Sequence, residues 1–557
     1  MGDFLNPCNG NSFTILAKRK DRYLFVDKTD FIEITNKRLD EDDRFIAVTR
    51  PRRFGKTVTA DMLLAYYSKA YAEQRIFDNL KISGKDSYTE YLNKYDVIYI
   101  DMNSIKDKYT SYKSDSSVYV EGIDDLVDFM QYMIMLELKK TSDYAEQISK
   151  DPLIGKKSLS SALQAICTYT GEKFILIMDE WDLIYRDYRD DNALQEKFIE
   201  LLRGLFKSKS GQACFALVYL TGILPIKKYN SQSALNVFKE YNMLRPVPYE
   251  KYFGFTEEEI DEIVKNPSCR ITRQELKDWY EGYRLNGIDI YNPNSVVSAV
   301  TDGVCQSYWS RTSSNEEVVR LINMNFDGIK DDIISLIEGS SIQFSCTTFQ
   351  NDMVSIKNKD DIFSLLVCLG YLGCMDDGDN YRLAYVPNRE IKNALADLVK
   401  VQPWFNSMPV IERSESLFKA ITALDGDSTA EIITQIHNSP NIPNISLLTY
   451  NREESMVFCL ISGLMWSTEK EYECFRELQS GKGSADLVYV PKRNARLPVL
   501  LIEFKYGRSA EKALHQIKEK EYFSRYRNGD YQNDILLIGI SYNPKTKDHQ
   551  CVIEKLN

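Results

Sequence analysis

Apolar and polar positions in the first half of the chain alternate between two patterns. Short, near-continuous apolar runs are separated by longer stretches of mixed apolar and polar residues. Continuous apolar runs of strand length indicate strands buried on both faces, and the mixed stretches indicate the helices that cover them. The expected strands are 44–49, 97–101, 174–178 and 214–221, and the expected helices include 57–68 and 122–140. We therefore predict a parallel sheet covered by helices on both faces.

The pattern changes after Tyr252. Thr256 followed by Glu259 is typical of a capping box at the start of a helix. Residues 361–372 are expected to form a helix and residues 381–387 a strand, with a turn at 376–379. A helix followed by a small hairpin permits a winged-helix-like element. The best linker candidate is 438–444, which contains two prolines and three asparagines.

Composition narrows the range of functions. The 557 residues are 43% hydrophobic and 27% charged, as expected for globular domains. A net charge of −11 argues against a chain that coats nucleic acid without specificity, but it leaves room for a local basic groove. The 11 Cys form no CxxC pair and there are only 3 His, so reduced thiols are expected rather than a zinc site. Without a leader pattern or an apolar run of about 20 residues, we expect a cytoplasmic protein with no membrane partner.

The first candidate site is Gly55-Lys56-Thr57, between an expected strand and an expected helix. This is the phosphate-binding end of a P-loop: glycine lets the backbone approach phosphate, lysine reaches the β- and γ-phosphates, and threonine ligates Mg²⁺. Arg53 and Val58 flank the tripeptide and are included among the nucleotide-binding residues. Arg50 stands where the usual pattern has glycine. A helix start with a surface lysine is the alternative interpretation.

An acidic pair supplies the expected partner of that loop. The apolar run 174–178 ends in Asp179-Glu180, an arrangement typical of a Walker B strand. Asp179 is expected to hold Mg²⁺, and Glu180 to polarise the attacking water. Thr221 ends a further strand and is either a γ-phosphate sensor or an ordinary turn residue.

The second candidate site lies near the C-terminus. Asp486 opens one expected strand of a hairpin, and Glu503 and Lys505 close the other, two residues apart and therefore on the same face. Phosphodiester hydrolysis needs acids that hold Mg²⁺ and a lysine or base that acts on the attacking water or the developing charge. Glu454, at the start of an apolar helix, could complete the metal shell, and the Phe504 carbonyl could add a ligand. The alternative is a surface hairpin with alternating charges.

With these two sites, the chain resembles bacterial AAA-ATPase-like proteins with a C-terminal PD-(D/E)XK nuclease-superfamily domain. The resemblance accounts for Arg50, because an Arg-Pro-Arg-Arg-Phe-Gly-Lys loop is characteristic of that family. It implies ATP and Mg²⁺ as cofactors, and it adds Gln516 and Tyr522 to the second site at the family's Gln and Tyr positions. The matching segments are 25–29, 50–57, 178–182, 221–223, 252–256, 279–283 and 291–293, in family order.

The resulting expectation is an α/β protein in four parts. These are a P-loop AAA-ATPase-like domain with a parallel sheet (1–250), a helical middle region with a winged-helix-like interpretation (251–400), a connecting segment (401–445) and an α/β restriction-endonuclease-like domain (446–557).

Three functions follow from these sites. The leading hypothesis is an ATP-regulated, Mg²⁺-dependent nuclease that acts on nucleic acid, with DNA favoured over RNA. The second is a nucleotide-switched binding or signalling module whose nuclease fold is inactive. The third is a homo-oligomeric remodeller, for which Arg284 is the candidate arginine finger.

Overall fold

The fold is known from a computed structural model, in which the chain forms two compact units. The first unit contains residues 1–329 and 343–394, and the second contains 330–342 and 395–557. The structure describes residues 2–18, 24–115, 120–150, 158–226, 235–309, 315–347, 349, 356, 358–378, 380–402, 409–438, 452–468, 471–480, 482–492, 495, 497–527 and 534–556. Of the expected linker 438–444, all but Asn438 lies outside the described residues.

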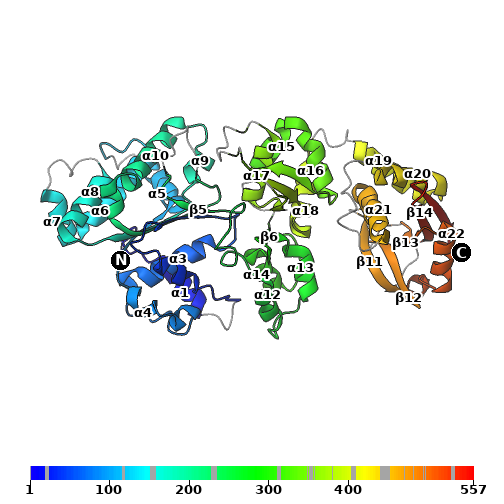
Figure 1. The fold of residues 1–557 in the computed structure, drawn as a ribbon, viewed down its shortest axis with the longest axis horizontal. Helices are drawn as coiled ribbons and strands as arrows, with labels where there is room; N and C mark the ends of the chain where they lie inside the picture. Colours follow the sequence, from blue (N-terminus) through cyan, green and yellow to red (C-terminus); the bar gives the residue numbers. More distant parts are fainter. Residues whose placement is uncertain are drawn as a thin grey trace. The chain divides into compact units, whose positions relative to one another are not determined.

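A five-stranded parallel sheet forms the centre of the first unit, as the sequence predicts (Figure 1). Its spatial order is β2-β3-β4-β1-β5, and every neighbouring pair is parallel. The strands are β1 (Phe45–Thr49), β2 (Asp96–Asp101), β3 (Phe174–Asp179), β4 (Phe215–Gly222) and β5 (Lys239–Tyr241). Every residue of β1, β3 and β4 is buried, because helices cover the sheet on both sides.

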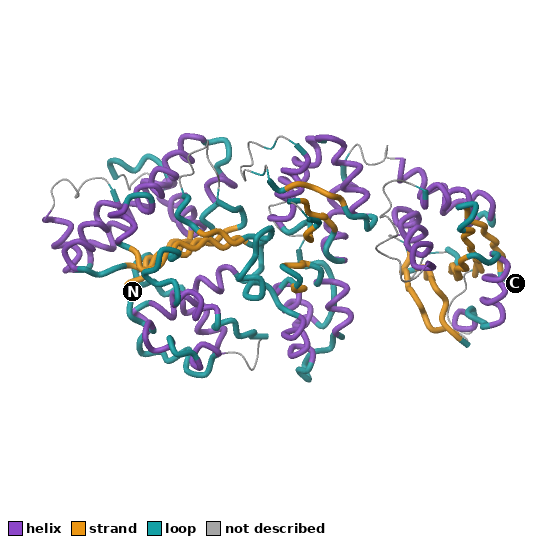
Figure 2. The backbone as a smooth tube through the Cα atoms, in the orientation of Figure 1, coloured by secondary structure: helices purple, strands orange, loops and turns teal. Residues whose placement is uncertain are grey.

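The two faces of this sheet carry different sets of helices (Figure 2). One face packs on α1 (Gly10–Lys18), α2 (Phe31–Asn36) and α3 (Lys56–Tyr67), and the other on α5 (Met102–Ser114), α6 (Leu126–Lys140), α8 (Leu159–Thr170) and α10 (Asn192–Phe206). The smaller elements are η1 (Lys69–Tyr71), η2 (Lys81–Gly84), α4 (Tyr88–Tyr91), α7 (Ser142–Lys150), α9 (Leu183–Asp187) and α11 (Lys209–Ala213).

A helical subregion follows the sheet within the first unit. It starts at the expected capping box, where Glu259 accepts a hydrogen bond from the Thr256 amide at 2.9 Å. Its helices between residues 257 and 302 share a small apolar core. The elements are α12 (Glu257–Val264), α13 (Arg273–Tyr280), the hairpin β6 (Tyr283–Leu285) and β7 (Ile288–Ile290), α14 (Pro293–Asp302), α15 (Asn315–Met324) and η3 (Phe326–Gly328).

The expected helix and hairpin of the middle region are present. They are α17 (Lys359–Leu369), β9 (Gly373–Asp376) and β10 (Tyr381–Tyr385), and β8 (Ile342–Ser345) completes a sheet of order β8-β10-β9. Residues 361–374 are all buried. From Asp361 onward the helix therefore has no exposed face with which to enter a nucleic-acid groove, and the winged-helix-like interpretation stays a prediction.

The second unit is built on a mixed sheet of order β11-β12-β13-β14-β15. Only β13 and β14 are parallel, and α22 connects them. One face packs on α19, α20 and α21, and the other on α22. The elements are α16 (Ile329–Ile337), α18 (Arg389–Lys400, shared with the first unit), α19 (Pro409–Thr422), α20 (Gly426–His437), α21 (Arg452–Thr468), β11 (Tyr472–Ser480), β12 (Gly483–Pro491), β13 (Val499–Tyr506), α22 (Ala510–Glu519), α23 (Ser524–Arg527), β14 (Ile535–Asn543) and β15 (Asp548–Lys555). None of the described helices is long and apolar enough to cross a membrane.

Candidate nucleotide and metal sites

The Gly-Lys-Thr segment lies at the junction of β1 and α3. Gly55 has a φ of +86°, a backbone conformation that favours glycine, and α3 begins at the next residue, so its first amides border the loop. Lys56 is only 4% exposed, and its Nζ donates to the Pro51 carbonyl at 3.0 Å. Burial lowers the pKa of Lys56. The Thr57 hydroxyl donates to Asp179 Oδ2 at 2.6 Å. A buried lysine with a carbonyl partner is well placed to receive an anion.

The expected acidic pair lies at the same edge of the sheet. Asp179 is the last residue of β3, and β4 lies between β3 and β1. Burial, with the charge of Glu180 as the second cause, raises the pKa of Asp179 to about 7. Thr221, near the end of β4, is fully buried, and its hydroxyl has no partner among the described residues. The carboxyl ends of parallel strands meet at one edge, so these groups lie on the loop side of the sheet.

Glu180 contacts two cations. Its Oε1 lies 3.9 Å from Lys56 Nζ, and its Oε2 accepts a hydrogen bond from Arg186 of α9. Arg186 also lies 3.1 Å from Asp182 Oδ2. The sequence analysis did not anticipate Arg186, because it is six residues from Glu180 and matches no motif used there.

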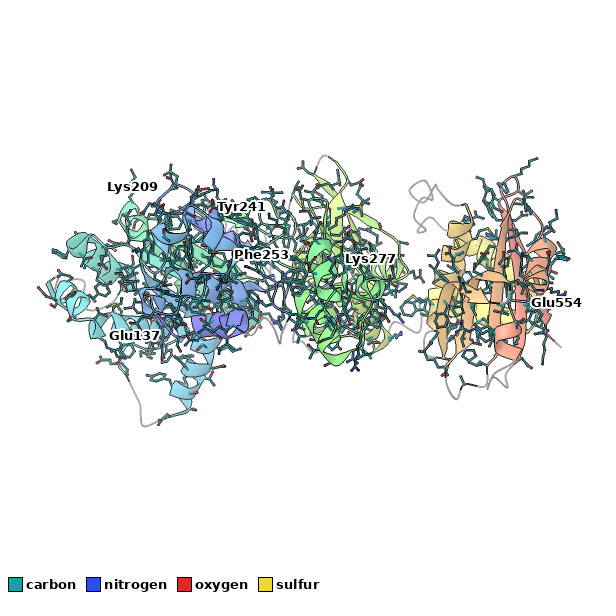
Figure 3. The ribbon with its side chains drawn as sticks, turned by 90° about the horizontal axis from the view of Figure 1, so that it is seen from below. Glu137, Lys209, Tyr241, Phe253, Lys277 and Glu554 are labelled. Carbon is teal, nitrogen blue, oxygen red and sulfur yellow. The ribbon has the colours of Figure 1, made fainter. Side chains whose placement is uncertain are left out.

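Arg50, the departure from the usual P-loop pattern, is fully buried. Its Nη1 donates to the carbonyls of Thr49 at 2.9 Å and Tyr241 at 3.0 Å, and its guanidinium lies 5.4 Å from the ring centroid of Phe253. Figure 3 labels Tyr241 and Phe253 in the first unit. Burial lowers the pKa of Arg50 to about 10. Arg50 therefore ties the loop to the chain that follows β4, and it is not among the described residues that line the cavity at this loop.

The rest of the loop contacts the middle region. A Cβ added at Gly370 would come within 2.6 Å of Pro51 Cβ, so the two backbones are in close contact. Arg53 Nη1 donates to the Tyr308 carbonyl at 2.6 Å, and the Phe54 ring packs edge-on against Tyr283 with centroids 5.1 Å apart. The unusual residues of this loop are thus the ones that connect it to residues far along the chain.

A cavity of about 710 Å³ opens at the loop. Its volume is within the range of about 300–1,000 Å³ that small-molecule sites occupy. Its polar lining residues include Arg52, Arg53, Gly55, Lys56, Thr57, Asn103, Glu180 and Arg186. Its apolar lining residues include Phe13, Leu16, Leu24, Phe25, Val26, Met62, Tyr252, Phe255, Pro293 and Val297. Val58 also lines it and is 43% exposed. A lining that combines cationic and other polar groups with apolar side chains fits the phosphates and the base of a nucleotide.

The second predicted site is built on β12 and β13, which form the expected antiparallel hairpin. Asp486 Oδ2 accepts a hydrogen bond from the Phe504 amide at 2.8 Å, which links the two strands. Lys505 Nζ donates to Glu503 Oε1 at 2.9 Å and to the Phe504 carbonyl at 3.0 Å. Asp486, Glu503 and Lys505 therefore lie together at one place on the sheet.

A residue of α22 joins this cluster. Gln516 Nε2 donates to Glu503 Oε1 and, at 3.1 Å, to the hydroxyl of Tyr522. Glu503 is 1% exposed, and burial together with the nearby charge of Asp486 raises its pKa to about 7. Its Oε2 has no partner among the described residues. A buried carboxylate oxygen without a donor, beside a second carboxylate, fits a cation.

The expected third acid cannot be placed. Glu454 lies in the first turn of α21, and its side chain is outside the described residues. Within the described part of the chain, no group of three or more His, Cys, Asp or Glu side chains could hold a metal ion. The available oxygen donors are those of Asp486 and Glu503 and the Phe504 carbonyl, a set suited to Mg²⁺ or Mn²⁺.

Arg284, the arginine-finger candidate, does not line the nucleotide cavity. Arg284 is on β6, its side chain is 52% exposed, and its Nε lies 3.5 Å from Asp289 Oδ1. It is not among the described residues that line the nucleotide cavity.

Comparisons with known proteins agree with this two-site arrangement. Residues 11–230 match a family described as a predicted AAA-ATPase, and residues 453–551 match the PD-(D/E)XK nuclease superfamily. A protein of Azotobacter chroococcum mcd 1, described as an uncharacterized protein in the vnfD 5' region, is 22% identical over 550 residues, which cover 96% of this chain and 95% of that one. The structure of the Aeropyrum pernix ORC2 protein in ADPNP–ADP complexes aligns with 67% of this chain and 93% of its own, at 12% identity and a TM-score of 0.27. So distant a likeness carries no argument about function.

Proposed function

We propose that this chain, which joins an AAA-ATPase-like domain to a C-terminal PD-(D/E)XK nuclease-superfamily domain, is an ATP-regulated, metal-dependent nuclease. One observation carries the nuclease half: Asp486, Glu503 and Lys505 converge, and a buried oxygen of Glu503 has no donor among the described residues. Such an oxygen is costly to leave without a partner, so a bound cation would offset that cost.

The residues divide the chemistry between them. Asp486 and Glu503 would hold Mg²⁺, which supplies Lewis-acid activation of the phosphodiester. Lys505, with its ammonium against Glu503, is placed to orient the attacking water or to neutralise charge that develops on the phosphate. Gln516 fixes the Glu503 carboxylate from α22, so it is a positioning residue. The substrate class is nucleic acid, with DNA favoured over RNA.

The nucleotide half rests on the cavity at β1 and α3. Arg53, Gly55, Lys56, Thr57 and Val58 line it, and they would face the phosphates. Bound Mg²⁺ would supply charge compensation for the phosphates, with Thr57 and Asp179 as its protein ligands. Glu180 would orient the hydrolytic water, and Thr221 is the candidate γ-phosphate sensor. The contacts of Pro51, Arg53 and Phe54 with residues beyond 280 support regulation through the middle region of the first unit.

A cleavage assay tests the nuclease half. Labelled single- and double-stranded DNA and RNA are incubated with Mg²⁺ or Mn²⁺, with and without ATP, and with wild type, Lys505→Ala or Lys518→Ala. Lys518 is the control because it lies on α22 and pairs with Glu554 at 2.5 Å. We expect Lys505→Ala to lower the rate by about 100-fold or more, as the loss of a charge-stabilising group does elsewhere. Equal cleavage rates for wild type and Lys505→Ala would contradict the nuclease assignment.

A second candidate is a nucleotide-switched binding or signalling module with an inactive nuclease fold. It is favoured by the finding that only two acids meet at the second site within the described residues. Calorimetric titration of wild type and Glu503→Gln with Mn²⁺ separates the two candidates. Loss of a binding event in Glu503→Gln supports the nuclease, whereas identical titrations with intact nucleotide binding support the binding module.

A further inference from the structure

The carboxylate of Glu180 occupies a place between two cations that both line the nucleotide cavity. On one side is Lys56 Nζ, 3.9 Å from Oε1, and on the other is Arg186, which donates to Oε2. The side chains of Lys56, Glu180 and Arg186 are 4%, 16% and 11% exposed. A largely desolvated anion between two largely desolvated cations satisfies both of them, and another anion that enters the cavity would compete with it for the same donors.

Arg186 is held in place independently of Glu180. Its Nε lies 3.1 Å from Asp182 Oδ2. The same oxygen of Asp182 accepts hydrogen bonds from the amides of Ile223 at 3.2 Å and Leu224 at 2.8 Å, directly after β4. Asp182 is fully buried. Departure of Glu180 would therefore leave Arg186 fixed to Asp182, with donors free to bind an anion in the cavity.

The backbone at Glu180 supports a switchable side chain. Its φ is +55°, a left-handed conformation that is uncommon for a residue with a Cβ. Such outliers persist where the surroundings enforce them, and they gather at switches and active sites. Here the side chain is held by an ion pair with Lys56 and a hydrogen bond from Arg186.

We propose that Arg186 is a specificity-determining residue that distinguishes a nucleoside triphosphate from a diphosphate by exchanging Glu180 for the γ-phosphate. This rests on the proposed nucleotide site. In the nucleotide-free chain, Glu180 takes the place of that phosphate between Lys56 and Arg186. The γ-phosphate carries about −1.5 to −2 charges at neutral pH against −1 for a carboxylate, so the two cations favour it. A diphosphate lacks the group that competes with Glu180, which stays bound to Arg186 and away from water.

The test compares affinities for the two nucleotides rather than turnover. Calorimetry with Mg²⁺ measures the dissociation constants of ADP and of a non-hydrolysable ATP analogue for wild type, Arg186→Gln, Glu180→Gln and Arg189→Gln. Arg189 is the matched control, because it lies three residues further on, is 44% exposed and does not line the described cavity.

Arg186→Gln and Glu180→Gln are expected to change the affinity for the ATP analogue in opposite directions. Arg186→Gln should lower the affinity for the ATP analogue about tenfold or more, the usual effect of losing a charge-assisted hydrogen bond. It should change the affinity for ADP by less than about threefold. Glu180→Gln should raise the affinity for the ATP analogue, because the carboxylate charge that competes with the γ-phosphate is gone. Arg189→Gln should change neither. Thermal unfolding of each variant shows whether the fold is retained.

Two results would overturn the proposal. In the first, Arg186→Gln lowers the affinities for ADP and for the ATP analogue equally, as a merely structural role would require. In the second, Glu180→Gln does not raise the affinity for the ATP analogue. A failure of the nucleotide site itself is recognised differently, since wild type would then bind neither nucleotide.

Discussion

The Thr57 hydroxyl donates a hydrogen bond of 2.6 Å to Asp179, and so joins the first turn of α3 to the end of β3 across 122 residues of sequence. This bond places the two proposed Mg²⁺ ligands beside each other before any ion binds. It also partly counteracts the rise in the pKa of Asp179 that burial causes.

Replacing the Thr57 hydroxyl should weaken Mg²⁺-dependent nucleotide binding. Thr57→Val keeps the shape of the side chain but removes the oxygen. We expect about a tenfold loss of ATP affinity with Mg²⁺ and little change with EDTA, because the oxygen removed is the proposed ligand of Mg²⁺. Thr57→Ser, which keeps the oxygen, should bind like wild type in the same fluorescence titration. Equal losses in the valine and serine variants would contradict the ligand role.

Asp179→Asn should stabilise the nucleotide-free protein above neutral pH. The folded pKa is about 7, whereas an unfolded aspartate titrates near 3.9. Between these values the folded chain keeps a proton that the unfolded chain releases, so stability falls as pH rises from about 4 to about 7. The asparagine variant avoids this loss. It should melt several degrees higher than wild type at pH 8, and like wild type near pH 4.

Scanning calorimetry between pH 4 and 8 measures this difference. Asp190→Asn serves as the control, because its side chain is 96% exposed and its replacement should not shift the melting temperature with pH. A gain in Asp179→Asn that is the same at every pH would mean that the buried charge is not its cause.

Metal binding at the second site should depend on pH through Glu503. Burial and the charge of Asp486 raise its pKa to about 7, and a cation binds the deprotonated carboxylate. The Mn²⁺ affinity attributable to Glu503 should therefore fall about tenfold for each pH unit below 7 and level off above it. Calorimetric titrations from pH 5.5 to 8.5, with Glu503→Gln subtracted, give this affinity. A flat profile across that range would rule out Glu503 as a ligand.

Gly370→Ala should disturb the contact between the loop and the middle region. Gly370 has a φ of +87°, and an added Cβ would come within 2.6 Å of Pro51 Cβ and 2.9 Å of the Trp309 ring. Gly378→Ala is a matched control: its φ is +78°, but its Cβ would meet nothing within 4 Å. The backbone penalty is shared, so the difference in free energy of unfolding isolates the packing clash, which should cost about 1–3 kcal/mol. Equal destabilisation in urea titrations would mean that Pro51 is not packed tightly there.

Local patterns were sufficient for elements whose side-chain direction follows from their own backbone. The apolar run 174–178 forms a buried strand, Thr256 and Glu259 form a capping box, and Glu503 and Lys505 share a face. Hydrophobic periodicity and capping act over a few residues, so the printed sequence contains them in full. The parallel sheet was predictable for the same reason.

Partnerships between distant segments were not predictable in this way. The sequence by itself determined the Gly55-Lys56-Thr57 junction, the acids that end β3 and the Glu503–Lys505 spacing. Only the tertiary structure decided that Arg186 bonds to Glu180, that buried Arg50 bonds to the Tyr241 carbonyl, and that Asp486 bonds to the Phe504 amide. Periodicity sets the direction of a side chain relative to its own backbone. The group that it meets depends on how whole strands and helices pack, and that is a property of the folded chain.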